Sequence, residues 1–148
     1  MGRRLTPKLI SGSALKIFRP AISTKNMVYL FVGNKSYKYP WEKSRVIYIG
    51  TSSRGIKRIT ESVANRGKVL SEHGFKEFEV RIVVCPKRQK VSTWKLLESA
   101  FLIVFREKFG GIPFLNKKGG KLKERGEWLY FSKGTIRKIL DELDADND

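Results

Sequence analysis

The chain has 148 residues, of which 41% are hydrophobic, and its 31 lysines and arginines against 14 acidic residues give a formal net charge of +17. A chain of this length and composition buries one core of ordinary size and leaves no room for a second full domain. The single cysteine, Cys85, and the single histidine, His73, exclude a disulfide within the chain and a zinc site made of Cys and His.

The positive charge is unevenly distributed. Five acidic residues lie within the last eight positions, so residues 1–140 hold 31 basic residues against nine acidic ones, a net charge of +22. This surplus favours a polyanion as partner, because each Lys or Arg placed against a phosphate releases condensed counterions. Nucleic acid is the first candidate, with DNA ahead of RNA, and an anionic membrane surface is the rival.

No apolar run approaches the roughly 20 residues needed to cross a bilayer, and no apolar signal-peptide segment follows the basic start. We therefore expect no integral membrane association. The single thiol fits a reducing compartment, so we expect a protein of the cytoplasm or the nucleoid.

Along the chain, residues 1–25 mix basic, small and turn-forming residues without a period, which predicts a basic N-terminal arm or short added elements. Residues 27–32 and 45–50 are typical of strands, and the long loop over residues 33–44 between them predicts a β-hairpin. A serine or threonine within residues 51–53 is expected to cap a helix that reaches about Asn65 and stops near Gly67.

A third strand is predicted over residues 78–85, followed by an apolar helix over residues 94–109 that Gly110-Gly111 terminates. Residues 128–131 indicate a short strand, and Ser132 is expected to cap a last helix with an apolar period of three to four residues. This order of elements predicts an α+β fold, in which helices flank a small antiparallel sheet of about three strands.

The domain organisation that follows is an N-terminal arm over residues 1–25, one domain over residues 26–140 and an acidic tail over residues 141–148. We expect the tail to aid solubility rather than to mimic nucleic acid.

Two tyrosines, Tyr29 and Tyr48, occupy the two strands of the predicted hairpin. If both side chains lie on one face of the sheet, they form either a packed aromatic pair or part of a site that cleaves phosphodiesters. Cleavage needs a group that removes a proton from water and cations that hold the phosphate. Tyrosine is a poor base at its free pKa of about 10, and a nearby Lys, Arg or metal ion would lower that value.

A guanidinium and a carboxylate follow these strands. Arg58, two turns into the predicted helix, either clamps a phosphate or remains a solvated surface charge. Glu98 is the only carboxylate in the apolar segment 96–105, and the helical period turns it toward the packed face. Burying a carboxylate alone is costly, so we expect a metal ion or an arginine beside it, with Arg58 or Arg81 as structural alternatives.

In order and approximate spacing, the chain resembles the GIY-YIG endonuclease family at Val28-Tyr29, Tyr48-Ile49-Gly50, Arg58, Glu98 and Asn116. The resemblance covers residues 27–116 and implies a small sheet that carries both tyrosines. It implies Tyr29 as general base, with Tyr48 and Arg58 positioning water and phosphate. It further implies Glu98 as the ligand of a single Mg²⁺ or Mn²⁺ and Asn116 as a brace. Where the family often has a histidine, one turn after Arg58, this chain has Ser62.

The loop between the tyrosine strands interleaves basic and aromatic residues, which suits either phosphate contact with base stacking or an ordinary solvated loop. The basic tract over residues 117–123 is expected to contact the phosphate backbone. The residues expected to bind nucleic acid are Lys35, Lys38, Trp41, Lys43, Arg45, Arg54, Lys117, Lys118 and Lys121.

The sequence thus predicts a Mg²⁺- or Mn²⁺-dependent endonuclease that hydrolyses phosphodiester bonds in DNA with water as the nucleophile. No small-molecule cofactor is expected. The alternative is a basic nucleic-acid-binding module with the same fold that does not cut.

Overall fold

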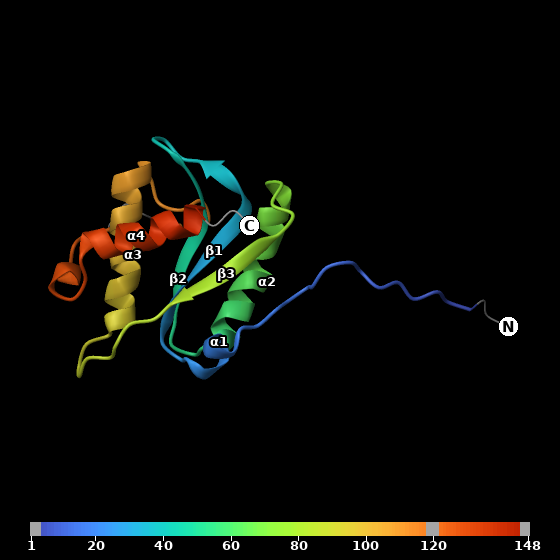
Figure 1. Cartoon of the computed structure of the whole chain (residues 1–148), viewed down its shortest axis with the longest axis horizontal. Coiled ribbons are helices and arrows are strands. Elements are labelled where there is room, and N and C mark those ends of the chain that lie inside the picture. The colour runs from blue at the N-terminus through green and yellow to red at the C-terminus, as the bar shows by residue number, and fades with distance from the viewer. Residues whose placement is uncertain (1–3, 118–121, 146–148) are drawn as a thin grey trace.

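A computed structural model describes residues 4–117 and 122–145 of the chain (Figure 1). Its elements in chain order are α1 (Arg19–Ser23), β1 (Met27–Lys38), β2 (Lys43–Ser52), α2 (Ile56–Glu72), β3 (Phe78–Val83), α3 (Thr93–Phe109), the 3₁₀ turn η1 (Glu127–Leu129) and α4 (Lys133–Ala145). The three strands form an antiparallel sheet in the order β2-β1-β3. This architecture confirms the predicted α+β class with a small antiparallel sheet.

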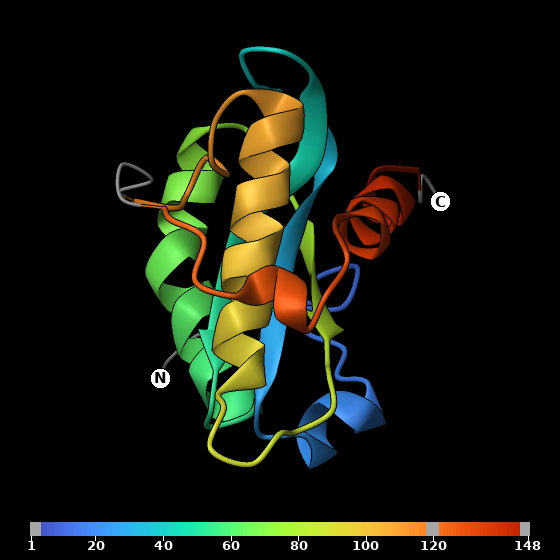
Figure 2. The same ribbon diagram turned by 90° about the vertical axis from the view of Figure 1, so that its left-hand side faces the viewer.

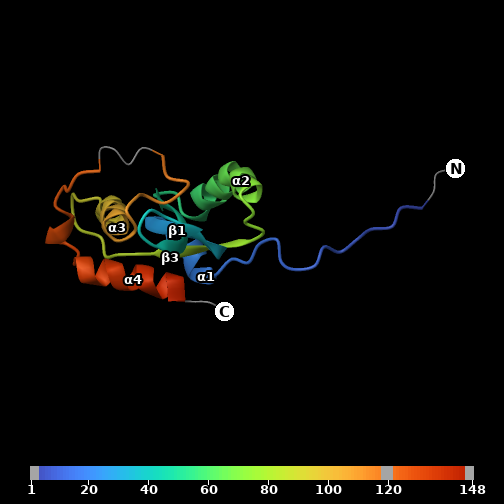
Figure 3. The same ribbon diagram turned by 90° about the horizontal axis from the view of Figure 1, so that it is seen from above.

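Helices cover both faces of the sheet, so β1 in its centre is buried on both sides. Alternate residues of β1 enter two different clusters, because successive side chains of a strand point to opposite faces. Val28 and Leu30 pack with α3 and α4, whereas Tyr29 and Phe31 pack with α2. Figure 3 shows α2 on one side of the sheet and α3 and α4 on the other, and Figure 2 shows α3 running along the sheet.

A β-bulge in β2 lies directly beside Tyr48, which faces α2 because it pairs with Phe31 in the regular part of the sheet. Phe31 pairs with Tyr48, but the next residue, Val32, pairs with Val46, so Ile47 is an extra residue in β2. Ile47 and Tyr48 consequently both contact the cluster under α2. Tyr29 and Tyr48 therefore share one face, as a joint site requires.

The hairpin differs from the sequence prediction in its loop. Residues 33–44 were expected to form a long loop, but β1 continues to Lys38 and β2 begins at Lys43, which leaves only residues 39–42 outside the strands. Tyr39 explains the extension: its hydroxyl donates to the Val46 carbonyl at 2.7 Å and accepts from the Phe114 N–H at 3.0 Å. These contacts hold the end of the hairpin against the body.

The helix after β2 is also longer than predicted. α2 begins at Ile56 after Gly55, which has a positive φ of 64° and provides no side-chain cap, and the helix passes through Gly67 to Glu72. The predicted stop at Gly67 is wrong because packing outweighs propensity: a glycine inside a helix costs about 1 kcal/mol. Burying Leu70 contributes about 2 kcal/mol.

α3 agrees with the prediction to within one residue, and Gly110 ends it with a φ of 82°. Residues 128–131, predicted as a strand, instead contribute to the turn η1, because Trp128 and Phe131 pack against the α3–α4 cluster rather than along a sheet edge. Ser132 caps α4 as predicted, accepting a hydrogen bond from the Thr135 N–H at 3.1 Å.

The acidic C-terminal segment begins inside a helix. α4 continues to Ala145, so residues 141–145 are helical. Asp144 accepts hydrogen bonds from the Ser44 hydroxyl at 2.9 Å and from the Arg45 N–H at 2.8 Å. This carboxylate therefore ties α4 to the start of β2.

In the arm, residues 4–18 form neither helix nor strand, and Figure 1 shows the chain leading away from the folded body. Its apolar side chains are exposed, Leu9 to 94%. Within residues 4–117 and 122–145, no helix has the length and apolar character that a membrane crossing requires.

Candidate active site

Tyr29 and Tyr48 lie against each other over Gly50. Their ring centroids are 5.9 Å apart at an interplanar angle of 44°, and Tyr29 pairs directly with Gly50 in the sheet. A Cβ atom at Gly50 would lie 2.8 Å from Tyr29 Cζ and 2.8 Å from Tyr48 Cε2, closer than such contacts allow. Only glycine at this position lets both rings lie there.

The two phenols differ in their environment. The Tyr29 hydroxyl is fully buried and has no hydrogen-bond partner among the described residues, although buried hydroxyls nearly always have one. Tyr48 is 7% exposed, and its burial raises the pKa of its hydroxyl to about 12. The neighbouring Tyr29 also raises this pKa, whereas the positive charge of Arg66 lowers it. The expectation that nearby cations lower a tyrosine pKa is therefore wrong for Tyr48, because desolvation outweighs them.

The guanidinium that reaches this pair belongs to Arg66. Its Cζ lies 4.1 Å from the centroid of the Tyr48 ring, and it donates to the Ser62 hydroxyl at 2.8 Å. Arg58, the predicted residue, lies 3.9 Å from Glu61. Residues 58, 62 and 66 follow one another at intervals of four, so they share one face of α2. The site thus contains an arginine, as predicted, but this arginine is Arg66, two turns of α2 after Arg58.

Glu98 joins the site from α3. It is half-buried, and burial raises the pKa of its carboxyl group above the ordinary value of 4.5, whereas hydrogen bonding from Thr51 and the charge of Lys95 lower it. Its charge also contributes to the raised pKa of Tyr48. The carboxylate therefore lies within electrostatic reach of the tyrosine pair, and it faces β2 one residue beyond Gly50.

Asn116 holds the exposed edge of β2. Its Nδ2 donates to the Ile49 carbonyl at 2.8 Å, and its Oδ1 accepts from the Ile49 N–H at 3.0 Å. The preceding Leu115 N–H donates to the Ile47 carbonyl at 2.9 Å. Because β2 is an edge strand, these bonds satisfy backbone groups that no further strand pairs with. Asn116 thereby fixes the residue between Tyr48 and Gly50, the bracing position that the resemblance implied.

Asn116→Ala is expected to lower the free energy of unfolding by about 2 kcal/mol, because it leaves the N–H and the carbonyl of buried Ile49 without partners. Urea unfolding monitored by circular dichroism measures the change. The neighbouring Lys117→Ala changes an exposed side chain, and it should stay within about 0.5 kcal/mol of the wild type. Equal stability of the two variants would remove the bracing role.

The residues predicted to bind nucleic acid fall in two places. Lys38 and Lys43 are paired at the tip of the hairpin, where both are exposed. Lys43 lies seven residues from Gly50 along β2, a separation of about 23 Å. Arg54 lies at the other end of the sheet, where it forms an ion pair with Glu61 at 2.9 Å. Lys117 follows Asn116 directly in the chain. The hairpin tip therefore does not reach the tyrosine pair.

Three other predicted contacts have structural partners. Arg45 Nε donates to the Gly33 carbonyl at 2.9 Å, and the Lys35 ammonium lies 5.0 Å from the centroid of the Phe75 ring. Trp41 is 68% exposed, but its backbone N–H donates to the Phe109 carbonyl at 3.1 Å. Lys118 and Lys121 lie outside the described residues. The exposed members of this predicted set are Lys35, Lys38, Trp41, Lys43, Arg54 and Lys117, and Arg45 is half-buried.

The donor set fits a weakly held Mg²⁺ or Mn²⁺. Within residues 4–117 and 122–145 there is no cluster of three or more His, Cys, Asp or Glu side chains. Mg²⁺ is often bound by one or two carboxylates together with several waters and the phosphates of a substrate. Glu98, with the Thr51 hydroxyl beside it, supplies such a single carboxylate.

Two residues of this site were missed by the sequence analysis, Arg66 and Thr51. Arg66 could have been found from its spacing, since it lies eight residues after Arg58 on the same helix face. The sequence indicates for Thr51 only the role of a helix cap. Its contact with Glu98 joins residues far apart in the chain and leaves no local signal.

No protein-family model, no curated protein and no solved structure matches this chain. The resemblance to the GIY-YIG endonucleases thus remains a hypothesis based on the residues and the geometry given above.

Proposed function

We propose that this protein is a metal-dependent endonuclease of the GIY-YIG type that hydrolyses phosphodiester bonds in DNA. The observation that supports it is the proximity of four groups at Tyr48: its own phenol, the Tyr29 hydroxyl, the Arg66 guanidinium and the Glu98 carboxylate. They come from β1, β2, α2 and α3. A base, a hydrogen-bond donor, a cation and a metal ligand are the groups that this hydrolysis needs.

Each group has a distinct role in the proposal. Tyr48, whose pKa is about 12, stays protonated at neutral pH and donates a hydrogen bond to the attacking water or to a phosphate oxygen. Arg66 holds the phosphate, which a planar guanidinium binds through two parallel hydrogen bonds. Tyr29, as its phenolate, accepts a proton from the water while the water oxygen bonds to phosphorus and the bond from phosphorus to the leaving oxygen breaks. Mg²⁺ or Mn²⁺ at Glu98 would neutralise charge on the phosphate and on the leaving oxygen.

The charge of the chain supports a nucleic-acid substrate. A net charge of +17 attracts a polyanion over long distances and makes its binding sensitive to salt. The exposed lysines of the hairpin tip, about 23 Å from Gly50, add a second contact along a duplex. A location in the cytoplasm or on the nucleoid is part of the same proposal.

Incubation of the purified protein with supercoiled plasmid and Mg²⁺ tests the proposal. We expect nicked and linear products, none in the presence of a chelator, and recovery when Mn²⁺ is added. Electrophoretic mobility shifts in the same buffers measure binding, which should weaken steeply as salt rises. Binding without cleavage across Mg²⁺, Mn²⁺ and Ca²⁺ would contradict the proposal.

A non-cutting nucleic-acid-binding module is the second candidate, and one observation favours it. Tyr29 is fully buried, so water reaches its hydroxyl only if the rings move. The two candidates predict the same salt-sensitive binding and differ in the plasmid assay alone.

A further inference from the structure

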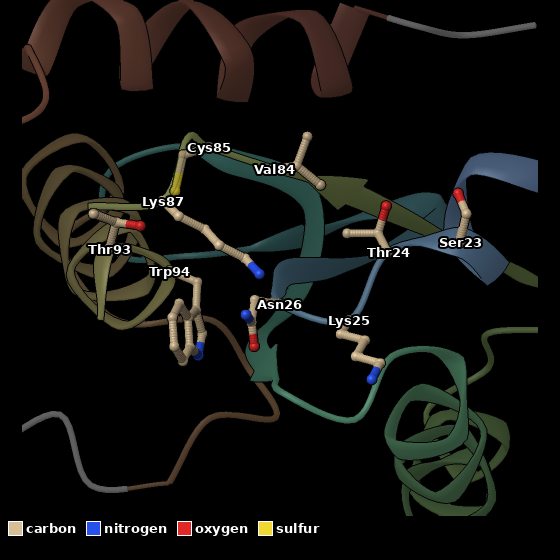
Figure 4. Close-up of a pocket in the computed structure, with 9 residues that line it drawn as sticks. All are labelled: Ser23, Thr24, Lys25, Asn26, Val84, Cys85, Lys87, Thr93 and Trp94. Atoms are coloured by element: carbon tan, nitrogen blue, oxygen red, sulfur yellow. The ribbon is translucent and has the colours of Figure 1, made fainter. Parts of the chain in front are cut away.

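A cavity of about 450 Å³ opens at the end of the sheet where β1 begins, β3 has ended and α3 starts (Figure 4). It is lined by Ser23, Thr24, Lys25, Asn26, Val84, Cys85, Lys87, Thr93 and Trp94. None of these lining residues is acidic, and two of them are lysines. The cavity is therefore suited to an anion.

The side chains in the cavity offer three kinds of contact. Figure 4 shows the Lys87 ammonium and the Asn26 amide turned toward the space in front of the Trp94 indole. An ammonium binds phosphate, an amide hydrogen-bonds the edge of a base, and an indole stacks on its face. The volume lies within the usual range of small-ligand pockets, about 300–1,000 Å³. Together, these properties match a single nucleotide.

The cavity adjoins the candidate active site. Trp94 precedes Glu98 by four residues on α3, so the two side chains lie on the same side of the helix. Asn26 immediately precedes Met27, which pairs with Ser52, and Ser52 follows the Thr51 that hydrogen-bonds Glu98. Both walls of the cavity therefore continue into the strand and the helix that hold Thr51 and Glu98.

We propose that this cavity binds one nucleotide of the substrate strand, next to the phosphate that is cleaved. The base stacks on Trp94, Asn26 contacts the base edge, and Lys87 binds the neighbouring phosphate, with Lys25 at the rim. This inference rests on the proposed endonuclease function for its role in the reaction, whereas nucleotide binding itself can be measured separately.

Nuclear magnetic resonance of the wild-type protein tests the binding, because each tryptophan gives one indole N–H signal. Titration with thymidine 5′-monophosphate should shift the Trp94 signal in a saturable way and leave those of Trp41 and Trp128 in place. Lys87→Ala should weaken this binding about 10-fold or more, as expected for loss of a charged contact. Lys76→Ala, which changes an exposed lysine outside the cavity, is the matched control and should bind as the wild type does.

The results separate the two proposals. In the plasmid assay, Lys87→Ala should raise KM and leave kcat unchanged. The nucleotide site would be contradicted if the wild type cleaves plasmid, its Trp94 signal does not shift at millimolar nucleotide and Lys87→Ala has an unchanged KM. The endonuclease proposal would remain. A saturable shift of the Trp94 signal in a protein that does not cleave plasmid would support nucleotide binding in the cavity and contradict the endonuclease proposal. An equal shift with inorganic phosphate would overturn base stacking.

Discussion

Tyr29→Phe is expected to reduce plasmid cleavage by about 10²–10⁴-fold, the usual effect of removing a general base, while the protein keeps or gains stability. The ring keeps its contacts with Phe31 and Tyr48. The hydroxyl that is removed is buried without a partner among the described residues, so its loss relieves a desolvation penalty of about 1 kcal/mol. Plasmid nicking and thermal unfolding of the same preparation measure both effects.

Tyr39→Phe is the matched control. It removes the same atom from another buried tyrosine, but this hydroxyl bonds the Val46 carbonyl and the Phe114 N–H. We expect a loss of about 2 kcal/mol in unfolding free energy and cleavage at the wild-type rate under conditions where the protein is folded. The two variants should therefore behave in opposite ways. Full cleavage by Tyr29→Phe would exclude Tyr29 as the base.

Glu98→Gln should abolish metal-dependent cleavage, by about 10²-fold or more, and should leave DNA binding intact. The amide keeps the shape of the side chain but loses the charge that holds a divalent cation. Nicking assays over a range of Mg²⁺ and Mn²⁺ concentrations measure the loss, and mobility shifts measure binding. Glu107→Gln on the same helix, an exposed carboxylate paired with Lys133 at 2.9 Å, should cut normally.

The same substitution has a consequence for stability. Because burial raises the pKa of Glu98 in the folded protein above its ordinary value of 4.5, the folded state binds this proton more tightly than the unfolded state does. The group therefore favours folding at acidic pH and opposes it once the pH rises through the folded pKa. Glu98→Gln should thus match or exceed the wild type in stability at pH 7. A large loss of stability at that pH would show that Glu98 is a structural ion-pair partner instead.

Local patterns in the chain anticipated the architecture well where burial follows a simple period. The alternation at residues 27–32 predicted a strand, and the apolar segment before Gly110 predicted α3 to within one residue. The predicted ends of the hairpin loop and of α2 were wrong where contacts with residues distant in the chain extended these elements. Tyr39 extended the hairpin through its bonds to Val46 and Phe114, and buried Leu70 carried α2 past Gly67.

The candidate site shows the same division. Strand and helix periods predicted that Tyr29, Tyr48 and Glu98 face the interior and placed Arg58 on one face of α2, and the family resemblance gave these residues their roles. Spacing did not distinguish Arg58 from Arg66, which share that face. The Arg58 guanidinium lies 3.9 Å from Glu61, whereas Arg66 donates to the Ser62 hydroxyl and lies over the Tyr48 ring.

From its own order of residues, this chain specifies an α+β fold, a strongly basic charge and the side chains for which we propose a role in phosphodiester cleavage. Its three-dimensional packing added the bulge at Ile47, the overlap of two rings at Gly50, the Thr51–Glu98 contact and the cavity at Trp94. The physical reason is the separation along the chain over which each interaction acts. Periodicity and charge act within a few residues of the chain, whereas register, desolvation and close approach depend on groups that meet only after the sheet and its helices have packed.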